Sequence, residues 1–289
     1  MTWGLMGRAC ARCLVAVLVA AAPLIPGLSP GALAGDRQAE TPVPTSVAPP
    51  KTPPTAITPS THVLEPAVAP SVGAVLREVP RDMWRFVSKD TAVVLAAGGG
   101  AALIAHTWDD DLANETEVSL QLINALEPGN TYGTFAVVLA GSFAVYGVGR
   151  AAGHSHLAVV GADLVRSQIV TQVWVQGLKF TVKRERPDGS NEVSFPSGHT
   201  AGGFAAAAVL GRHYGWKAAL PAYIGASYIA AARVDGNKHY LSDVVFGAAM
   251  GLAGGRTVVL MPGRYGVQVV PAVTPDQIAL AVTLVPLGQ

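Results

Sequence analysis

The sequence predicts an all-α protein, a helical bundle of about six or seven helices with a short β appendage at its C-terminus. Between Arg81 and Pro262 the apolar stretches have the length of helices and are rich in Ala and Gly. They show little of the period-two alternation that is typical of half-buried strands. Hydrophobic residues make up 50% of the chain and charged residues only 13%, which indicates an unusually apolar core, a membrane contact, or both.

Seven segments of this helical domain, which we place at residues 81–262, are expected to form helices. They lie near residues 90–106, 115–126, 131–149, 155–180, 199–213, 217–232 and 240–257. After Pro262 the composition changes, because residues 265–270 and 278–285 are rich in β-branched and other apolar residues. This pattern favours two short strands in a C-terminal tail at residues 263–289.

Residues 1–34 are predicted to be a secretory signal peptide. Arg8 and Arg12 precede an apolar run at residues 14–28, and Ala32 and Ala34 are small residues at the spacing that a signal peptidase reads. An uncleaved anchor helix is the alternative, although two prolines shorten the run below the ~20 residues of a spanning helix. We therefore expect an exported protein of the periplasm or cell envelope.

Residues 35–80 are predicted to be a disordered tether between this segment and the helical domain. They are rich in Pro, Thr, Ala and Val. Proline removes backbone donors and favours an extended, hydrated chain. A ligand for a proline-recognising domain is the alternative to a plain spacer.

Two features of the composition exclude whole classes of function. Cys10 and Cys13 are the only cysteines, and both lie in the predicted signal peptide. Disulfides, thiol catalysis and zinc–thiolate sites are therefore excluded for the mature chain. The formal net charge is +1, which gives no sign of the basic face that a nucleic-acid partner requires.

The sequence of the helical domain is compatible with two architectures. One is a compact bundle in the periplasm or on a membrane surface, and the other is a multi-span membrane protein. Only residues 128–149 form a long stretch without charge, and the next apolar stretch is interrupted by Asp163 and Arg166. Mid-bilayer charges cost several kcal/mol unless they face a protein interior, which favours the compact bundle. Asp163 and Arg166 are spaced to pair along one helix face.

Residues 196–199, Pro-Ser-Gly-His, are predicted to open a helix that binds an anion. Ser197 is a good N-cap residue, and Gly198 lets the backbone approach a ligand closely. Free N–H groups at a helix start, with the helix dipole behind them, attract negative charge. His199 would then lie at the rim of that site, where it can move a proton. A purely structural helix cap is the alternative.

The segment at residues 233–243 contains a histidine and a carboxylate four residues apart. His239 and Asp243 are expected to be neighbours on one helix face, where the carboxylate can hold the Nδ1–H and leave Nε2 free to act as a nucleophile. Arg233 lies before this pair and can bring a planar cation to the same oxygens. A surface contact between His239 and Asp243 is the alternative.

The segment at residues 179–187 adds two further cations, Lys179 and Arg186, near a helix end that Pro187 closes. Lys183 and Arg184, between them, are interpreted as a solvated basic helix end. The acidic run at residues 109–111 is interpreted as a helix start, which the dipole favours, and not as a divalent-ion site. No metal site is expected.

In order and spacing, these three segments resemble the signature of the type 2 phosphatidic acid phosphatase and vanadium haloperoxidase superfamily, over about residues 85–255. The resemblance implies that His239 attacks phosphorus and forms a phosphohistidine, and that His199 protonates the leaving alkoxide and later activates water. It also implies which groups bind the phosphoryl oxygens: Lys179, Arg186, Ser197, the Gly198 amide and Arg233. Ala232 departs from the pattern, because the family usually has serine there.

The resemblance implies a metal-independent phosphatase that needs no cofactor, because three cationic side chains stabilise the phosphoryl oxygens. The expected substrate is a lipid phosphate, a polyprenyl pyrophosphate or a small phosphoester, with membrane contact where the substrate is a lipid. Two other functions stay open: a haloperoxidase that holds vanadate in the same pocket, and a binder of phosphorylated envelope lipids without catalysis.

Overall fold

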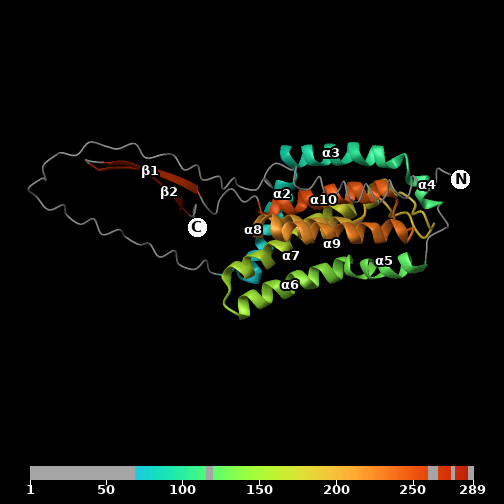
Figure 1. Ribbon diagram of the computed structural model, residues 1–289, viewed down its shortest axis with the longest axis horizontal. Helices are drawn as coiled ribbons and strands as arrows, with labels where there is room; N and C mark the ends of the chain where they lie inside the picture. The colour runs from blue at the N-terminus through green and yellow to red at the C-terminus, as the bar shows by residue number, and fades with distance from the viewer. Residues whose placement is uncertain (1–68, 115–119, 260–265, 275–276, 286–289) are drawn as a thin grey trace, which may run out of the picture.

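The computed structural model describes residues 69–114, 120–259, 266–274 and 277–285. Within these ranges it contains nine helices and two strands (Figure 1). They are α2 (Val72–Phe86), α3 (Lys89–His106), α4 (Asp109–Ala113), α5 (Leu120–Tyr132), α6 (Phe135–Ala151), α7 (Ser155–Val182), α8 (Gly198–Tyr214), α9 (Trp216–Asp235), α10 (Leu241–Val259), β1 (Gly266–Thr274) and β2 (Gln277–Val285). The predicted all-α class is confirmed. The predicted signal peptide lies outside the described residues.

Helix α2 corrects the predicted boundary between tether and domain. It begins at Val72, inside the segment expected to be disordered, and contains Pro80. The Ser71 side chain accepts a hydrogen bond from the Ala74 N–H, and Val75 and Phe86 are buried on one side of the helix. An N-cap and a buried stripe therefore outweigh the one backbone donor that Pro80 removes.

The hairpin of β1 and β2 lies where the sequence favours a β appendage. The strands pair antiparallel, with Gly266 opposite Val285 and Thr274 opposite Gln277. Two residues, 275 and 276, separate them. A two-residue connection is among the commonest in β-hairpins.

Helix α7 is the central helix of the bundle and packs against α2, α6, α8 and α10. Small residues bring its neighbours close. A side chain built at Gly254 of α10 would come within 2.0 Å of the Thr171 hydroxyl, and one at Gly161 would come within 2.2 Å of the Tyr146 backbone nitrogen. The Ala- and Gly-rich composition therefore reflects close helix packing, since neither position has room for a methyl group.

We expect Gly161→Ala to destabilise the fold and Gly147→Ala, on α6, to stabilise it slightly. The added methyl group at Gly161 overlaps the Tyr146 backbone, whereas nothing lies within 4 Å of one at Gly147. The free energy of unfolding should fall by about 1–3 kcal/mol in the first variant. It should rise by about 0.5–1 kcal/mol in the second. Denaturant unfolding of both variants measures this, and equal stability would contradict the packing described.

The expected pair of Asp163 and Arg166 forms within a larger buried cluster. Arg166 Nη1 lies 2.9 Å from Asp163 Oδ1, and its Nε lies 2.7 Å from Asp82 Oδ2 on α2. His213 Nε2, at the end of α8, lies 2.9 Å from Asp163 Oδ2. The charges that interrupt the apolar stretch of α7 therefore face the protein interior, where they tie α2 and α8 to α7.

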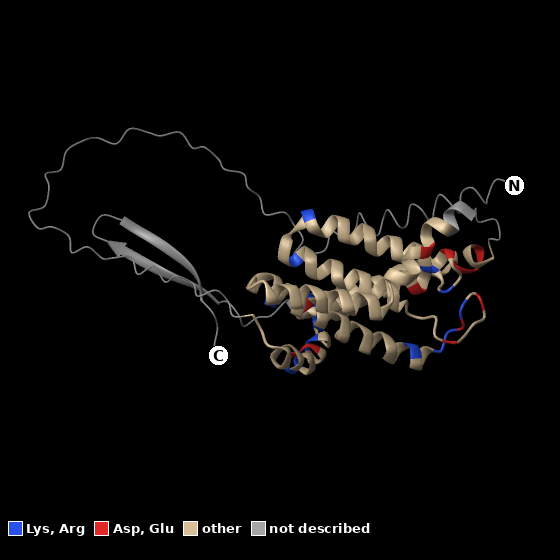
Figure 2. Ribbon diagram, turned by 90° about the horizontal axis from the view of Figure 1, so that it is seen from below, with Lys and Arg blue, Asp and Glu red and all other residues tan. Residues whose placement is uncertain are grey.

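Charged residues are unevenly distributed along the bundle. Figure 2 shows the Lys, Arg, Asp and Glu residues gathered towards the two ends of the helices, with few between them. Of the helices in the described ranges, none is by itself long and apolar enough to cross a membrane. Two bent pairs meet the length and composition test only when their helices are taken together, α2 with α3 and residues 124–132 with α6.

Candidate functional site

The three motif segments meet at the end of the bundle near α4 (Figure 1). This end contains the C-termini of α7 and α9, the N-termini of α8 and α10, and the loops between them. The Ser197 N–H donates to the Asp243 carbonyl at 3.0 Å, and the His239 N–H donates to the Arg233 carbonyl at 3.1 Å. All the side chains expected to carry the chemistry thus come from one end of four adjacent helices.

His239 lies in the loop before α10 and not on a helix, which corrects the expected i,i+4 arrangement. α10 begins at Leu241, so only Asp243 is helical. The His239 Nδ1 lies 3.7 Å from Asp243 Oδ2, and the two side chains are 2% and 0% exposed. This distance is longer than a hydrogen bond, although the carboxylate still faces the imidazole. Burial lowers the pKa of His239 to about 4, so the ring is neutral at pH 7.

The Asp243 carboxylate is held by three groups other than His239. Its Oδ2 accepts hydrogen bonds from the Ser194 hydroxyl at 2.5 Å and from the Tyr240 N–H at 2.9 Å. Its Oδ1 accepts from Arg184 Nη1 at 2.7 Å. Burial opposes ionisation, but these hydrogen bonds and the Arg184 charge outweigh it and hold the pKa of Asp243 below its ordinary value. Asp243 is therefore a fixed negative charge behind the imidazole.

Arg184 is not the solvated residue that the sequence suggested. Besides Asp243 it contacts Asp109 Oδ2 at 2.9 Å, and its guanidinium lies 4.0 Å from the centre of the Tyr240 ring. The residue after α7, Lys183, has a left-handed conformation with φ 49°, which turns the chain back towards α10. The basic run in the sequence carried no signal for this turn, so the interpretation was wrong for Arg184, whereas Lys183 is exposed as expected.

Asp109 begins a helix as expected, but it is also part of the site's support. Its carboxylate is 1% exposed and accepts hydrogen bonds from the Ser242 N–H at 2.9 Å and from the Ser242 hydroxyl at 2.5 Å. It therefore anchors the start of α10, 133 residues away in sequence. Asp110 and Asp111, by contrast, are exposed.

Lys179 and Arg233 are buried cations at the same end. Each is 6% exposed. The Lys179 ammonium donates to the Val193 carbonyl, and Arg233 Nη1 donates to the Asn130 side-chain oxygen at 2.7 Å. Burial and the neighbouring Arg186 lower the pKa of Lys179 to about 8 and that of Arg233 to about 10. These cations therefore repel one another, and an anion between them would relieve the repulsion.

We expect phosphate affinity to fall as the pH rises above about 8, where Lys179 loses its proton in the free protein. The sign follows from linkage: an anion binds the protonated ammonium more tightly, so binding weakens once the free group is neutral. Titration with inorganic phosphate or vanadate from pH 6 to 10 measures this loss of affinity. Lys179→Arg should remove it, because a guanidinium stays charged throughout that range.

The start of α8 is arranged differently from the expected cap. Ser197 takes the N-cap position, but its side chain caps no N–H and instead accepts a hydrogen bond from the Thr200 hydroxyl at 3.0 Å. Gly198 packs against α7, since a side chain there would come within 3.2 Å of the Gln172 amide oxygen. The backbone N–H groups of the first turn are thus left without a side-chain cap.

His199 follows Gly198 on α8 and is half-buried. Burial, with the nearby Arg233 and His239, lowers its pKa to about 3, while a hydrogen bond to the Asn130 backbone opposes the shift. The ring is therefore neutral in the free protein at pH 7. A phosphate dianion beside it would favour the protonated form.

Three buried donors of the predicted site have no hydrogen-bond partner within the described residues. They are Arg186 Nε, Arg233 Nε and His239 Nδ1. An unpaired buried donor costs about 1–3 kcal/mol, so native proteins rarely contain several together. Their gathering at one end of the bundle is what a site for a polar or anionic ligand produces.

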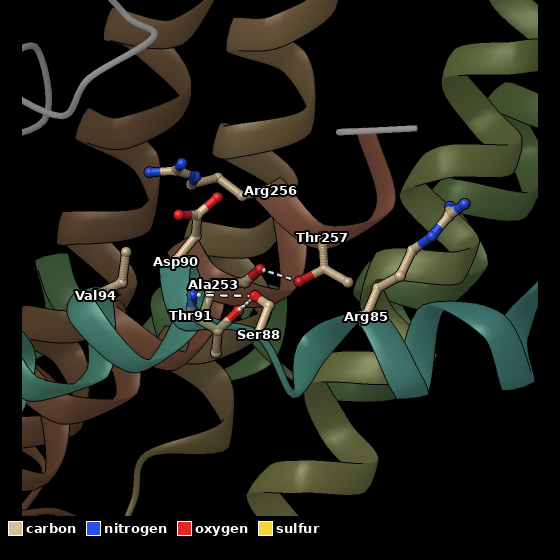
Figure 3. A pocket seen from close by; sticks show the side chains of 8 residues that line it. All are labelled: Arg85, Ser88, Asp90, Thr91, Val94, Ala253, Arg256 and Thr257. Atoms are coloured by element: carbon tan, nitrogen blue, oxygen red, sulfur yellow. Dashed lines mark hydrogen bonds between the residues drawn. The ribbon is translucent and has the colours of Figure 1, made fainter. Parts of the chain in front are cut away.

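A separate cavity of about 200 Å³ lies at the other end of α10, beside the break between α2 and α3 (Figure 3). Its lining includes Arg85, Asp90 and Arg256, so positive and negative charges both border it. None of the predicted site residues lines this cavity. Among the residues that the structure describes, no group of three or more His, Asp or Glu side chains is arranged to hold a metal ion.

Fold and site together define a helical protein that gathers three cations and two histidines at the end of its bundle. The model of the PAP2 superfamily matches residues 135–266, which include every predicted site residue. Over these residues the chain is similar to the PAP2 superfamily.

Two curated proteins are similar to parts of the chain. A lipid A 1-phosphatase of Porphyromonas gingivalis is 40% identical over 77 residues, which are 26% of this chain and 17% of that protein. A lipid A 4'-phosphatase of Helicobacter pylori is 33% identical over 98 residues, 30% of this chain and 49% of that protein. The chain therefore spans less than half of the length of either relative. No solved structure shows significant similarity to the chain.

Proposed function

We propose that this protein is a metal-independent phosphatase that cleaves phosphomonoesters through a phosphohistidine on His239. The observation that carries the proposal is the set of unpaired buried donors on Arg186, Arg233 and His239. A tetrahedral oxyanion would pair the two guanidinium donors, while His239 Nδ1 faces the Asp243 carboxylate at 3.7 Å and Nε2 is left to attack phosphorus. Both similar proteins are named as phosphatases, which favours hydrolysis over halide oxidation or binding alone.

In the first step the lone pair on His239 Nε2 attacks phosphorus. The N–P bond forms while the bond from phosphorus to the ester oxygen breaks, and the leaving oxygen takes a proton from His199. The positive charge that appears on the His239 ring faces the Asp243 carboxylate, 3.7 Å from Nδ1. Lys179, Arg186 and Arg233 offset the charge on the equatorial oxygens, as preorganised cations do in other phosphoryl transfers.

In the second step water releases the phosphate. His199, now neutral, takes a proton from a water molecule whose oxygen attacks phosphorus, and the N–P bond breaks to regenerate His239. The low pKa of His199 in the free protein, about 3, favours this base role. Its acid role in the first step depends on the bound phosphoryl group, whose negative charge stabilises the protonated ring.

We propose a phosphorylated lipid of the cell envelope as the substrate class. The two similar proteins are named for lipid A, and the exposed surface of the bundle is rich in apolar side chains. Val93, Leu103 and Ile104 on α3 are 69%, 73% and 63% exposed. Figure 1 shows α3 running along the bundle towards α4, so this face leads to the site end. We propose that it contacts membrane lipid.

Phosphate release in EDTA tests the proposed activity. A lipid monophosphate in mixed micelles and a soluble aryl phosphate should be compared at equal concentration. We expect release from both, with the larger kcat/KM for the lipid. No release from either substrate would rule out the phosphatase. Release from the aryl phosphate alone would rule out the lipid substrate and leave the chemistry standing.

Vesicle binding tests the proposed membrane contact separately. We expect Leu103→Asp to reduce co-sedimentation with phospholipid vesicles, because a carboxylate on the apolar face disfavours lipid contact. Ile224→Asp, at an exposed position of α9, is the matched control. Unchanged binding by the Leu103 variant would exclude α3 as the lipid contact.

A further inference from the structure

We propose that Asn130, on α5, is a positioning residue that orients both Arg233 and His199. It lies outside the three motifs and before the first residue of the PAP2 match, at residue 135. Its side-chain oxygen accepts a hydrogen bond from Arg233 Nη1 at 2.7 Å, and its backbone lies close enough to the His199 ring to raise the pKa of that ring. One residue thus contacts a phosphate-binding cation and the proton-transfer histidine.

Two glycines let α5 come close enough for these contacts. A side chain at Gly129 would lie 2.8 Å from the Ala232 methyl group, and one at Gly133 would lie 2.4 Å from Ile229 Cγ2 and 3.2 Å from His199 Cβ. Asn130 therefore lies in a segment packed directly against the end of α9. The approach is part of the fold and does not depend on a ligand.

The same contacts explain the alanine at position 232. Ala232 is 1% exposed and faces Gly129, so a larger side chain there would push α5 away. Arg233 donates a hydrogen bond to the Asn130 side-chain oxygen, on another helix. We infer that α5 fixes the orientation of the Arg233 guanidinium in this chain.

Asn130 determines which donors of the site stay available. With Arg233 Nη1 held by the amide oxygen, the Nε of the same guanidinium is one of the unpaired buried donors. The Asn130 backbone also lies beside the His199 ring, which exchanges a proton with substrate and water in the proposed mechanism. Loss of the Asn130 side chain therefore frees the guanidinium to rotate away from the phosphoryl oxygens.

Orthovanadate binding and steady-state kinetics test this role. We expect Asn130→Ala to weaken vanadate binding about tenfold and to lower kcat/KM by about 10- to 100-fold, as misplacement of a charged group does. Thr131→Ala, at the exposed neighbouring position, should match the unaltered chain in both measurements. Asn130→Ala with vanadate affinity and kcat/KM within twofold of the unaltered chain would overturn the proposal.

Asn130→Asp separates positioning from a general packing effect. It keeps the acceptor for Arg233 and the shape of the side chain, but it adds a negative charge beside His199 and the bound anion. We expect weaker vanadate binding and a His199 titration moved to higher pH, followed by NMR of the ring. An unmoved titration with unchanged binding would overturn the proposal even if Asn130→Ala fails to fold. The kinetic readout rests on the proposed function, whereas vanadate binding does not require turnover.

Discussion

His239→Ala is expected to lower phosphate release by on the order of 10⁴-fold or more, because it removes the atom that we propose bonds to phosphorus. The ring is 2% exposed, and the His239 N–H donates to the Arg233 carbonyl, which fixes the backbone that carries the ring. The unaltered protein should also form an acid-labile phosphoryl adduct when quenched during turnover, and the variant should form none. Phosphate release and adduct trapping measure the two effects.

Two companion variants make the result specific to the nucleophile. His239→Asn keeps most of the buried volume and should be equally inactive while melting close to the unaltered protein. His154→Ala, at an exposed position before α7, should keep full activity. Activity of the His239 variants within tenfold of the unaltered protein would show that another residue bonds to phosphorus.

Asp243→Asn is expected to lower turnover by on the order of 10⁴-fold, as loss of the carboxylate behind a catalytic histidine does elsewhere. The amide can no longer stabilise the charged ring that forms when His239 attacks. It also leaves Arg184 with one carboxylate partner, Asp109, instead of two. We expect the free energy of unfolding at pH 7 to fall by about 1–3 kcal/mol.

The pH dependence of this stability loss has a definite sign. The pKa of Asp243 is lowered in the folded chain, so its carboxylate stabilises the fold above the unfolded pKa of about 3.9. That contribution disappears as the pH falls through the folded pKa. The difference in stability between the variant and the unaltered chain should therefore shrink below about pH 4.

Asp235→Asn is the matched control for Asp243→Asn. Burial raises the pKa of Asp235, so its ionised form is disfavoured by the fold and loss of its charge should not destabilise the protein. Unfolding curves of both variants from pH 3 to 8 measure the comparison. An Asp243 variant as stable and as active as the Asp235 variant would contradict the role given to the carboxylate.

The helical class and the motif residues followed from the sequence because both depend on local pattern. Helix-length apolar stretches with Ala and Gly predict close-packed helices whatever their order in space. Charge spacing likewise predicted the pair of Asp163 and Arg166, which lies within one helix. The motif positions from Lys179 to Asp243 were recognised from residue type and spacing, and their roles follow from the resemblance to a known family.

The residues that support the site could not be found in this way. Asp109 anchors α10 across 133 residues, and Asn130 reaches Arg233 across 103 residues. The sequence places Arg184 at a solvated helix end, whereas in the fold the left-handed residue Lys183 turns the chain back towards α10. Each of these contacts depends on where a helix ends and which helix lies beside it.

By itself, the sequence determined which charged and proton-exchanging side chains are available, since formal charge belongs to the residue type. Only the tertiary structure decided that His239 precedes its helix, that Asp243 is held by Ser194 and Arg184, and that α5 takes part at all. The physical reason is that a hydrogen bond between distant segments produces no periodic pattern of residues in either segment. It exists only once packing has brought them together.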